Sequence, residues 1–374
     1  MNILDYIDWR GDLTFAQSSL NEVDNLIFST LAYLNMDHLV SEDDSSSPTI
    51  EELYQLYTAA GYDQSFMANN PQPLLQKAAQ SARFKDIRVQ WYINKIDVEQ
   101  QLQFAAVTFI ISDGLAYVAF RGTDNTIVGW REDCNLSFLP ETPGQNEAVM
   151  YVNRVAEKTR GDLIVGGHSK GGNFAVYAAA FCDEAVKHRV VKVYSNDGPG
   201  FNNQVAESDQ YLSVLSKTVK IIPDSSLIGI LLLSKATRRI IKSDAKGIMQ
   251  HNPYSWCVMG ASFESADERA DASLFMDETL SEWIAGLSAE NKQILVNGVF
   301  DALEASGAKT LREISENKWD SFTAIVKAAA QIDPDSRSDI KETVKKLFAS
   351  GKDAAKNELQ RNTEMNGGGN NHPE

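Results

Sequence analysis

Apolar residues change their spacing along the chain, and each spacing predicts a different kind of element. Between residues 18 and 83 they recur at helical intervals, which predicts a group of N-terminal amphipathic helices. Ser19 and Glu22 have the spacing of a capping box before one helix, and Thr49 and Glu52 repeat it before another. Helices are therefore expected before any sheet begins.

Between residues 84 and 264 the pattern changes to short runs rich in β-branched and aromatic residues, which are typical of strands. Three runs follow in succession, IRVQWYI, LQFAAVTFII and LAYVAF, and the turn pair Asp113-Gly114 joins the last two. Helical segments then alternate with the runs DLIVGG, VVKVYS, VKIIP and RRIIKS. This alternation predicts an α/β fold with a mostly parallel central sheet and helices on both faces.

Strand signals stop after residue 264. We expect one α/β domain over residues 1–264, a helical C-terminal region over 265–361 and a disordered tail over 362–374. The apolar run LIGILLL at 227–233 is expected to be a buried helix of the core, and the alternative is an acyl pocket or a lid.

Composition excludes several classes of protein. With 43% hydrophobic residues the chain can bury a large core, and its net charge of −16 would repel nucleic acid and anionic membranes. Three cysteines without CxxC spacing predict neither a disulfide framework nor a zinc site, so we expect no metal and no cofactor. A secretory signal and an integral membrane segment are both missing from the pattern, which favours the cytoplasm.

The strongest chemical signal is Gly167-His168-Ser169-Lys170-Gly171, between the apolar run DLIVG and the small-residue helix GGNFAVYAAA. A serine at a sharp strand-to-helix turn projects above the sheet, and the flanking glycines avoid collisions with the neighbouring strand and helix. This context predicts a nucleophilic serine, Ser169. A glycine-rich phosphate-binding turn is less favoured, because the chain has neither G-x-G-x-x-G nor a Walker pattern.

A serine nucleophile needs a histidine base and an orienting acid. Of the five histidines, His251 follows the last predicted strand and fits the chain order. The others are placed less well, either beside the serine, before the sheet, at the far end of a helix or in the tail: His168, His38, His188 and His372.

Three aspartates that follow successive strands can supply the acid. We expect Asp224, which comes one residue past the strand VKIIP. Asp197 is the first alternative, although its Asn-Asp-Gly-Pro-Gly setting predicts local N–H partners for its oxygens. Asp244 is the second alternative, and its lysine neighbours suggest a solvated strand edge.

The segment FRGTD, at the end of an earlier strand, is a candidate oxyanion loop. An oxyanion hole in this architecture takes one N–H from the residue after the serine, Lys170, and another from an earlier loop, here Thr123. The alternative is a strand-ending turn in which Arg121 pairs with Asp124 or Asp133.

Several segments resemble a bacterial domain-of-unknown-function family of the α/β-hydrolase superfamily that is similar to the class 3 lipases: YIDWRGDLTF, NEVDNLIFSTLAYLNMD, FRGTDNTIVGWREDCNLSF, VGGHSKGGNFAVYAAA, VYSNDGPGF and IMQHNPYSW. The resemblance covers about residues 1 to 260. It implies an α/β-hydrolase fold, with Thr123 as an oxyanion donor and Asp224 as the acid. The chain departs from the lipases at Lys170, where they usually have a small apolar residue.

Together these features predict a serine hydrolase that cleaves a carboxylic ester, lipase- or esterase-like, with a small-molecule or lipid ester as its substrate. The competing hypothesis is a non-catalytic α/β-hydrolase scaffold that binds a partner through its helical C-terminal region. A metal enzyme has no support, because the histidines and acidic residues lack ligand spacing.

Overall fold

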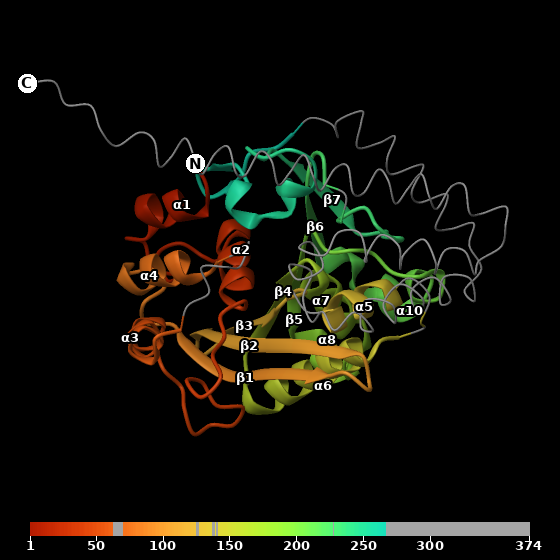
Figure 1. Ribbon diagram of the computed structural model, residues 1–374, viewed down its shortest axis with the longest axis horizontal. Helices are drawn as coiled ribbons and strands as arrows, with labels where there is room; N and C mark the ends of the chain where they lie inside the picture. Colours follow the sequence, from red (N-terminus) through yellow and green to blue (C-terminus); the bar gives the residue numbers. More distant parts are fainter. Residues whose placement is uncertain (63–69, 125–126, 137–138, 140, 227, 267–374) are drawn as a thin grey trace, which may run out of the picture.

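The computed structural model of the protein describes residues 1–62, 70–124, 127–136, 139, 141–226 and 228–266 (Figure 1). The expected helical region at 265–361 lies outside the described residues except for 265 and 266, and the expected tail at 362–374 lies outside them entirely.

A seven-stranded sheet forms the centre of the molecule, and its strands are arranged in sequence order. The first three strands pair antiparallel, and each later strand pairs parallel to the one before it. The mostly parallel sheet of the predicted α/β-hydrolase fold is thereby confirmed. The strands are β1 (Arg88–Asp97), β2 (Leu102–Ser112), β3 (Leu115–Phe120), β4 (Asp162–His168), β5 (Val190–Asn196), β6 (Thr218–Pro223) and β7 (Thr237–Ile241).

Helices cover both faces of the sheet. Alternate residues of a strand point to opposite sides, so each strand contributes apolar side chains to both helical layers. Tyr117 and Ala119 pack with the N-terminal helices, whereas Val118 and Phe120 pack with the later ones. Crossovers between parallel strands are nearly always right-handed, and the strand order advances in one direction, so the connecting helices share one face. The N-terminal helices occupy the other face (Figure 1).

The N-terminal layer consists of α1 (Ile3–Arg10), α2 (Glu22–Leu31), α3 (Ile50–Ala60) and α4 (Gln72–Gln80). The remaining described helices are α5 (Ile127–Asn135), α6 (Pro143–Lys158), α7 (Lys170–Phe181), α8 (Glu184–Arg189), α9 (Asn203–Ala206) and α10 (Asp209–Val214). Short 3₁₀ segments η1 (Leu215–Lys217), η2 (Gly247–His251) and η3 (Pro253–Ser255) and the hairpin β8 (Val258–Met259) and β9 (Ser262–Phe263) complete the described chain. The sequence pattern predicts neither α1 nor this hairpin.

The caps of the N-terminal helices differ in part from those expected. The predicted box of Ser19 and Glu22 is wrong, because Asn21 caps α2 and the box is closed by Asp24. Asn21 Oδ1 accepts from the backbone N–H of Asp24, and the Asp24 carboxylate accepts from the N–H of Asn21. The second predicted box, before α3, is confirmed.

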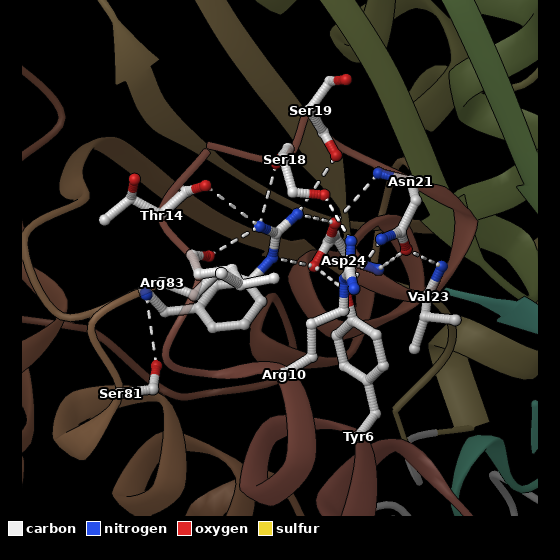
Figure 2. Close-up of polar contacts among 12 residues, drawn as sticks. Tyr6, Arg10, Thr14, Ser18, Ser19, Asn21, Val23, Asp24, Ser81 and Arg83 are labelled. Carbon is white, nitrogen blue, oxygen red and sulfur yellow. Dashed lines mark hydrogen bonds and ion pairs between the residues drawn. The ribbon is translucent and has the colours of Figure 1, made fainter. Parts of the chain in front are cut away.

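A buried ion pair holds the N-terminal layer together (Figure 2). The Arg83 guanidinium donates to both oxygens of Asp24, at 2.7 and 2.5 Å, and both side chains are fully buried. The same guanidinium donates to the carbonyls of Leu13 and Ser18, and the Tyr6 hydroxyl donates to Asp24 at 3.0 Å. These bonds fix the segment between α1 and α2 against the segment that follows α4.

Residues 228–233 form turns instead of the expected core helix, and residue 227 lies outside the description. The backbone groups of Leu233 exchange hydrogen bonds with those of Phe201, at 2.8 and 3.0 Å. Leu232 has a positive φ of 66°. Because these groups bond to another segment, the run cannot continue as a helix. No helix in the described part of the chain is long and apolar enough to cross a membrane.

Candidate active site

Ser169 lies at a sharp turn between β4 and α7. Its backbone has a φ of 60° and a ψ of −133°, a conformation that costs free energy for a residue with a Cβ atom. Its hydroxyl makes no capping bond to the helix that it precedes, and its N–H donates to the carbonyl of Asn196 at 2.9 Å. The predicted strand, turn and helix are confirmed, and the side chain is partly exposed.

Two glycines make this turn sterically possible. A Cβ atom on Gly167 would collide with the backbone of Gly171 in α7. A Cβ atom on Gly171 would collide with the carbonyl of Phe120 at the end of β3. Each glycine of the G-x-S-x-G motif is therefore required by close approach of the neighbouring helix and strand, as the sequence predicts.

His251 ends η2, and its imidazole lies over the ring of His168. The two ring centroids are 4.5 Å apart at an interplanar angle of 34°. Its Nδ1 lies 2.7 Å from Oδ2 of Asp197. Because a carboxylate can only accept, Nδ1 carries the proton and Nε2 is left as the basic nitrogen. The predicted approach of Nε2 to Ser169 Oγ stays a prediction.

The acid that contacts His251 is Asp197, so the predicted bond between His251 and Asp224 is wrong. Asp197 is fully buried and has a positive φ of 49°, which turns its side chain away from the strand direction. The Asx-turn interpretation predicts that its oxygens accept from local N–H groups, but their partners lie elsewhere in the chain. Oδ2 faces His251, and Oδ1 accepts from the hydroxyl of Ser226 at 2.5 Å. Gly229 packs directly against Oδ1.

Asp224 contacts the residue that precedes His251. Its Oδ1 accepts from Nε2 of Gln250 at 2.7 Å and from the Ser225 hydroxyl at 3.1 Å. It therefore holds the residue before His251 instead of His251 itself. Asp244 is placed elsewhere again, with its Oδ1 3.3 Å from the thiol of Cys257.

The FRGTD segment reaches the elbow through its glycine. A Cβ atom on Gly122 would lie 2.9 Å from Cβ of Ser169, so Thr123, the next residue, is beside the candidate nucleophile. The Thr123 hydroxyl donates to Oδ2 of Asp133 at 2.5 Å. Arg121 pairs with Asp124 at 3.6 Å, which is the first of the two pairings considered for the alternative turn.

The Lys170 side chain enters a buried polar cluster formed with residues of β2 and α5. Its Nζ donates to Glu132 at 2.9 Å and to the side-chain oxygen of Gln103 at 2.7 Å, and both charged side chains are fully buried. Asp133 lies 3.8 Å from the same ammonium. Burial raises the pKa of Asp133 to about 6, although the Lys170 ammonium and the Thr123 hydroxyl act in the opposite direction.

Two further residues of the site have no signal in the sequence pattern. Tyr33, just after α2, bonds to His168 on the elbow, and Ser226 bonds to Asp197. Among the described side chains, no group of three or more His, Cys, Asp or Glu residues converges as metal ligands.

Comparisons with known proteins give one family and several distant structures. Two similar solved structures are a lipase, M37, and the Rhizomucor miehei lipase in its propeptide complex. M37 lipase is 16% identical with a TM-score of 0.37, over 57% of this chain and 71% of that one. The Rhizomucor enzyme is 14% identical with a TM-score of 0.38, over 64% and 81%. No curated protein matches the chain.

The family comparison covers more than half of the sequence. It spans residues 78–301, which include the whole sheet, the Ser169 elbow, Asp197 and His251. The chain belongs to the Mbeg1-like family.

Proposed function

We propose that the protein is a serine hydrolase that cleaves carboxylic esters, with Ser169, His251 and Asp197 as its catalytic triad. The observation that carries this proposal is the 2.7 Å contact between His251 Nδ1 and the buried Asp197 carboxylate, at the edge of the sheet where Ser169 occupies its elbow. A buried carboxylate on Nδ1 fixes the tautomer that a general base requires. The expected substrate is a small-molecule or lipid ester.

In the proposed reaction Ser169 Oγ attacks the acyl carbon while His251 Nε2 takes the serine proton. His251 then gives that proton to the alcohol oxygen as the ester C–O bond breaks. Water then gives a proton to the same nitrogen and attacks the acyl carbon, and His251 returns that proton to Ser169 Oγ as the acyl–Oγ bond breaks and the carboxylic acid leaves. Asp197 stabilises the imidazolium in both steps and remains ionised.

The backbone N–H groups of Lys170 and Thr123 are the proposed oxyanion donors. Lys170 is the first residue of α7, where N–H groups have no partner within the helix. The Thr123 hydroxyl already donates its proton to Asp133, so the N–H is the group left to meet the oxyanion. Each donor of this kind is worth about 3–4 kcal/mol of transition-state stabilisation.

A fluorophosphonate probe tests this proposal, because it phosphonylates activated serines whatever the natural acyl group. We expect the wild type to be labelled and Ser169→Ala to be unlabelled. Ser225→Ala is a matched control, since Ser225 contacts Asp224 and not the triad, and it should be labelled like the wild type. An unlabelled wild type would favour the competing non-catalytic scaffold.

A further inference from the structure

His168 is the residue between the elbow glycine and Ser169, and its buried ring makes two hydrogen bonds. Nε2 lies 2.8 Å from the backbone carbonyl oxygen of His251, and Nδ1 lies 3.0 Å from the hydroxyl of Tyr33. The Tyr33 hydroxyl also lies 3.4 Å from the carbonyl of His168. One imidazole thus bridges the N-terminal layer and the loop that presents the proposed base.

The carbonyl partner settles the direction of these bonds. A carbonyl oxygen only accepts, so Nε2 of His168 carries the proton. Burial lowers the pKa of His168 well below its ordinary value, so the ring is neutral and Nδ1 must accept. The Tyr33 hydroxyl is then the donor to Nδ1, and burial raises its pKa, so it keeps that proton.

The other end of the chain of bonds reaches the oxyanion loop. The backbone N–H of Gly122 bonds to the Tyr33 hydroxyl, which packs so closely that a Cβ atom on Gly122 would collide with it. The bonds therefore run in one direction, from Gly122 N–H to Tyr33, from Tyr33 O–H to His168, and from His168 Nε2–H to the carbonyl of His251.

A second ring N–H bonds to the carbonyl of the residue that precedes His251. Nε1 of the buried Trp256 donates to the carbonyl of Gln250 at 2.9 Å. Two consecutive carbonyls, of Gln250 and His251, are thus tied by two buried ring donors. Only the His168 donor is itself linked to the loop of Thr123.

We propose that Tyr33 and His168 form a positioning relay, which sets the His251 backbone relative to the oxyanion loop. This inference rests on the proposed function. Neither residue is assigned contact with substrate, so the relay acts through the placement of His251 and Thr123. A misplacement of about 1 Å in such a group can reduce a rate by about 100-fold.

Rates of fluorophosphonate labelling test the relay. When the rate is measured over a range of probe concentrations, the maximal rate reports the chemical step and the half-saturating concentration reports binding. His168→Met removes both bonds, and we expect the maximal labelling rate to fall by about 10–100-fold with little change in the half-saturating concentration. His168→Gln keeps an N–H near the Nε2 position and should recover part of that loss. Tyr33→Phe removes one oxygen and should lower the maximal rate as well. Tyr211→Phe is the matched control, because it removes a buried hydroxyl on the opposite face that accepts from the Lys235 N–H.

A nitrogen-15 spectrum of the His168 ring gives a readout that mere packing would not move. We expect a neutral ring protonated at Nε2, and a shift of the Nδ1 resonance in Tyr33→Phe as its donor is lost. The relay is overturned if His168→Met and Tyr33→Phe label at the wild-type rate, or if Nδ1 carries the proton. A wild type that is not labelled at all would instead overturn the proposed function and the role of the relay with it.

Discussion

At the scale of single residues, the orientation of one imidazole decides whether Ser169 can be activated. Asp197 is held from both sides, because Oδ1 accepts from Ser226 while Oδ2 faces His251. A carboxylate with both oxygens engaged has little freedom to rotate, so it presents one oxygen to Nδ1 and selects the tautomer of the neutral imidazole in which Nε2 accepts.

The two aspartates differ in what their replacement should do. We expect Asp197→Asn to lower kcat by up to about 10⁴-fold, because an amide permits the wrong tautomer of His251. Asp224→Asn should have a small effect, since Asp224 bonds to Gln250 and not to the base. Parallel kinetics on a short-chain nitrophenyl ester measure both. If the loss fell on Asp224→Asn while Asp197→Asn kept its turnover, the assignment of the acid would be wrong.

His168 should also contribute to the dependence of stability on pH. Its pKa in the folded state is well below the ordinary value of about 6.5, so the unfolded chain binds more protons at mildly acidic pH. Stability should therefore fall as the pH decreases below about 6.5, by up to about 1.4 kcal/mol per pH unit from this group. Urea unfolding of the wild type and His168→Gln between pH 7 and pH 5 measures it. Equal slopes for the two proteins would contradict this expectation.

At this scale the sequence identifies two of the three proposed triad residues. Ser169 follows from its motif and context, and His251 from chain order and elimination. The acid does not follow, because Asn196 and Ile221 pair across β5 and β6, so these strands bring Asp197 and Asp224 to the same edge of the sheet. The positive φ that turns Asp197 toward His251 depends on tertiary contacts that chain order does not encode.

At the scale of elements, α5 is held to the elbow by the buried pair of Lys170 and Glu132. Oε1 of Glu132 accepts from the N–H of Gly144 at the start of α6, and Oε2, which contacts Lys170, also accepts from the N–H of Gln103. One carboxylate therefore joins β2, α5, α6 and α7 around the proposed oxyanion hole.

Breaking the pair of Lys170 and Glu132 should lower the free energy of unfolding. Lys170→Met leaves the Glu132 charge buried and uncompensated, and we expect a loss of about 3–5 kcal/mol in the free energy of unfolding. Lys170→Met with Glu132→Gln removes both charges and keeps an acceptor, so it should recover much of the loss. Arg154→Met breaks an exposed pair with Glu42 and should cost about 1 kcal/mol or less. Urea unfolding compares the three, and a double variant no more stable than Lys170→Met would refute the buried-charge explanation.

Element boundaries are predicted well where the local signal is strong. The hairpin turn at Asp113-Gly114 and the helix after Ser169 both appear as expected. The run at 227–233 is predicted wrongly, because its apolar composition fits a core helix as well as it fits the turns that residues 228–233 form. The bonds between Leu233 and Phe201 come from a segment remote in sequence, and no local pattern reports them.

At the scale of the whole molecule, the two helical layers have different origins. The layer of α6, α7 and α10 follows from right-handed crossovers, which alternating helix and strand patterns predict. The N-terminal layer covers the opposite face and brings Tyr33 to the elbow, and this arrangement depends on tertiary contacts. A sequence separation of 135 residues leaves no periodic signal for the contact between Tyr33 and His168.

Because the N-terminal layer and the sheet share one hydrophobic core, we expect them to unfold together. Arg83→Met leaves Asp24 buried without its partner and should cost about 3–5 kcal/mol. Tryptophan fluorescence and far-ultraviolet circular dichroism should report the same shift in the urea midpoint. Lys77→Met, which breaks the exposed pair with Asp8, serves as the control. Two separate transitions in Arg83→Met would show that the layers are not one cooperative unit.

In the proposed mechanism, Ser169, His251 and Asp197 act together against an ester carbonyl. A crystal structure of the protein after reaction with a fluorophosphonate tests it most directly. We predict phosphorus bonded to Ser169 Oγ, a phosphonyl oxygen accepting from the N–H groups of Lys170 and Thr123, and His251 bridging the adduct and Asp197. An adduct on another residue, or an intact Ser169 hydroxyl after exposure to the probe, would contradict this mechanism.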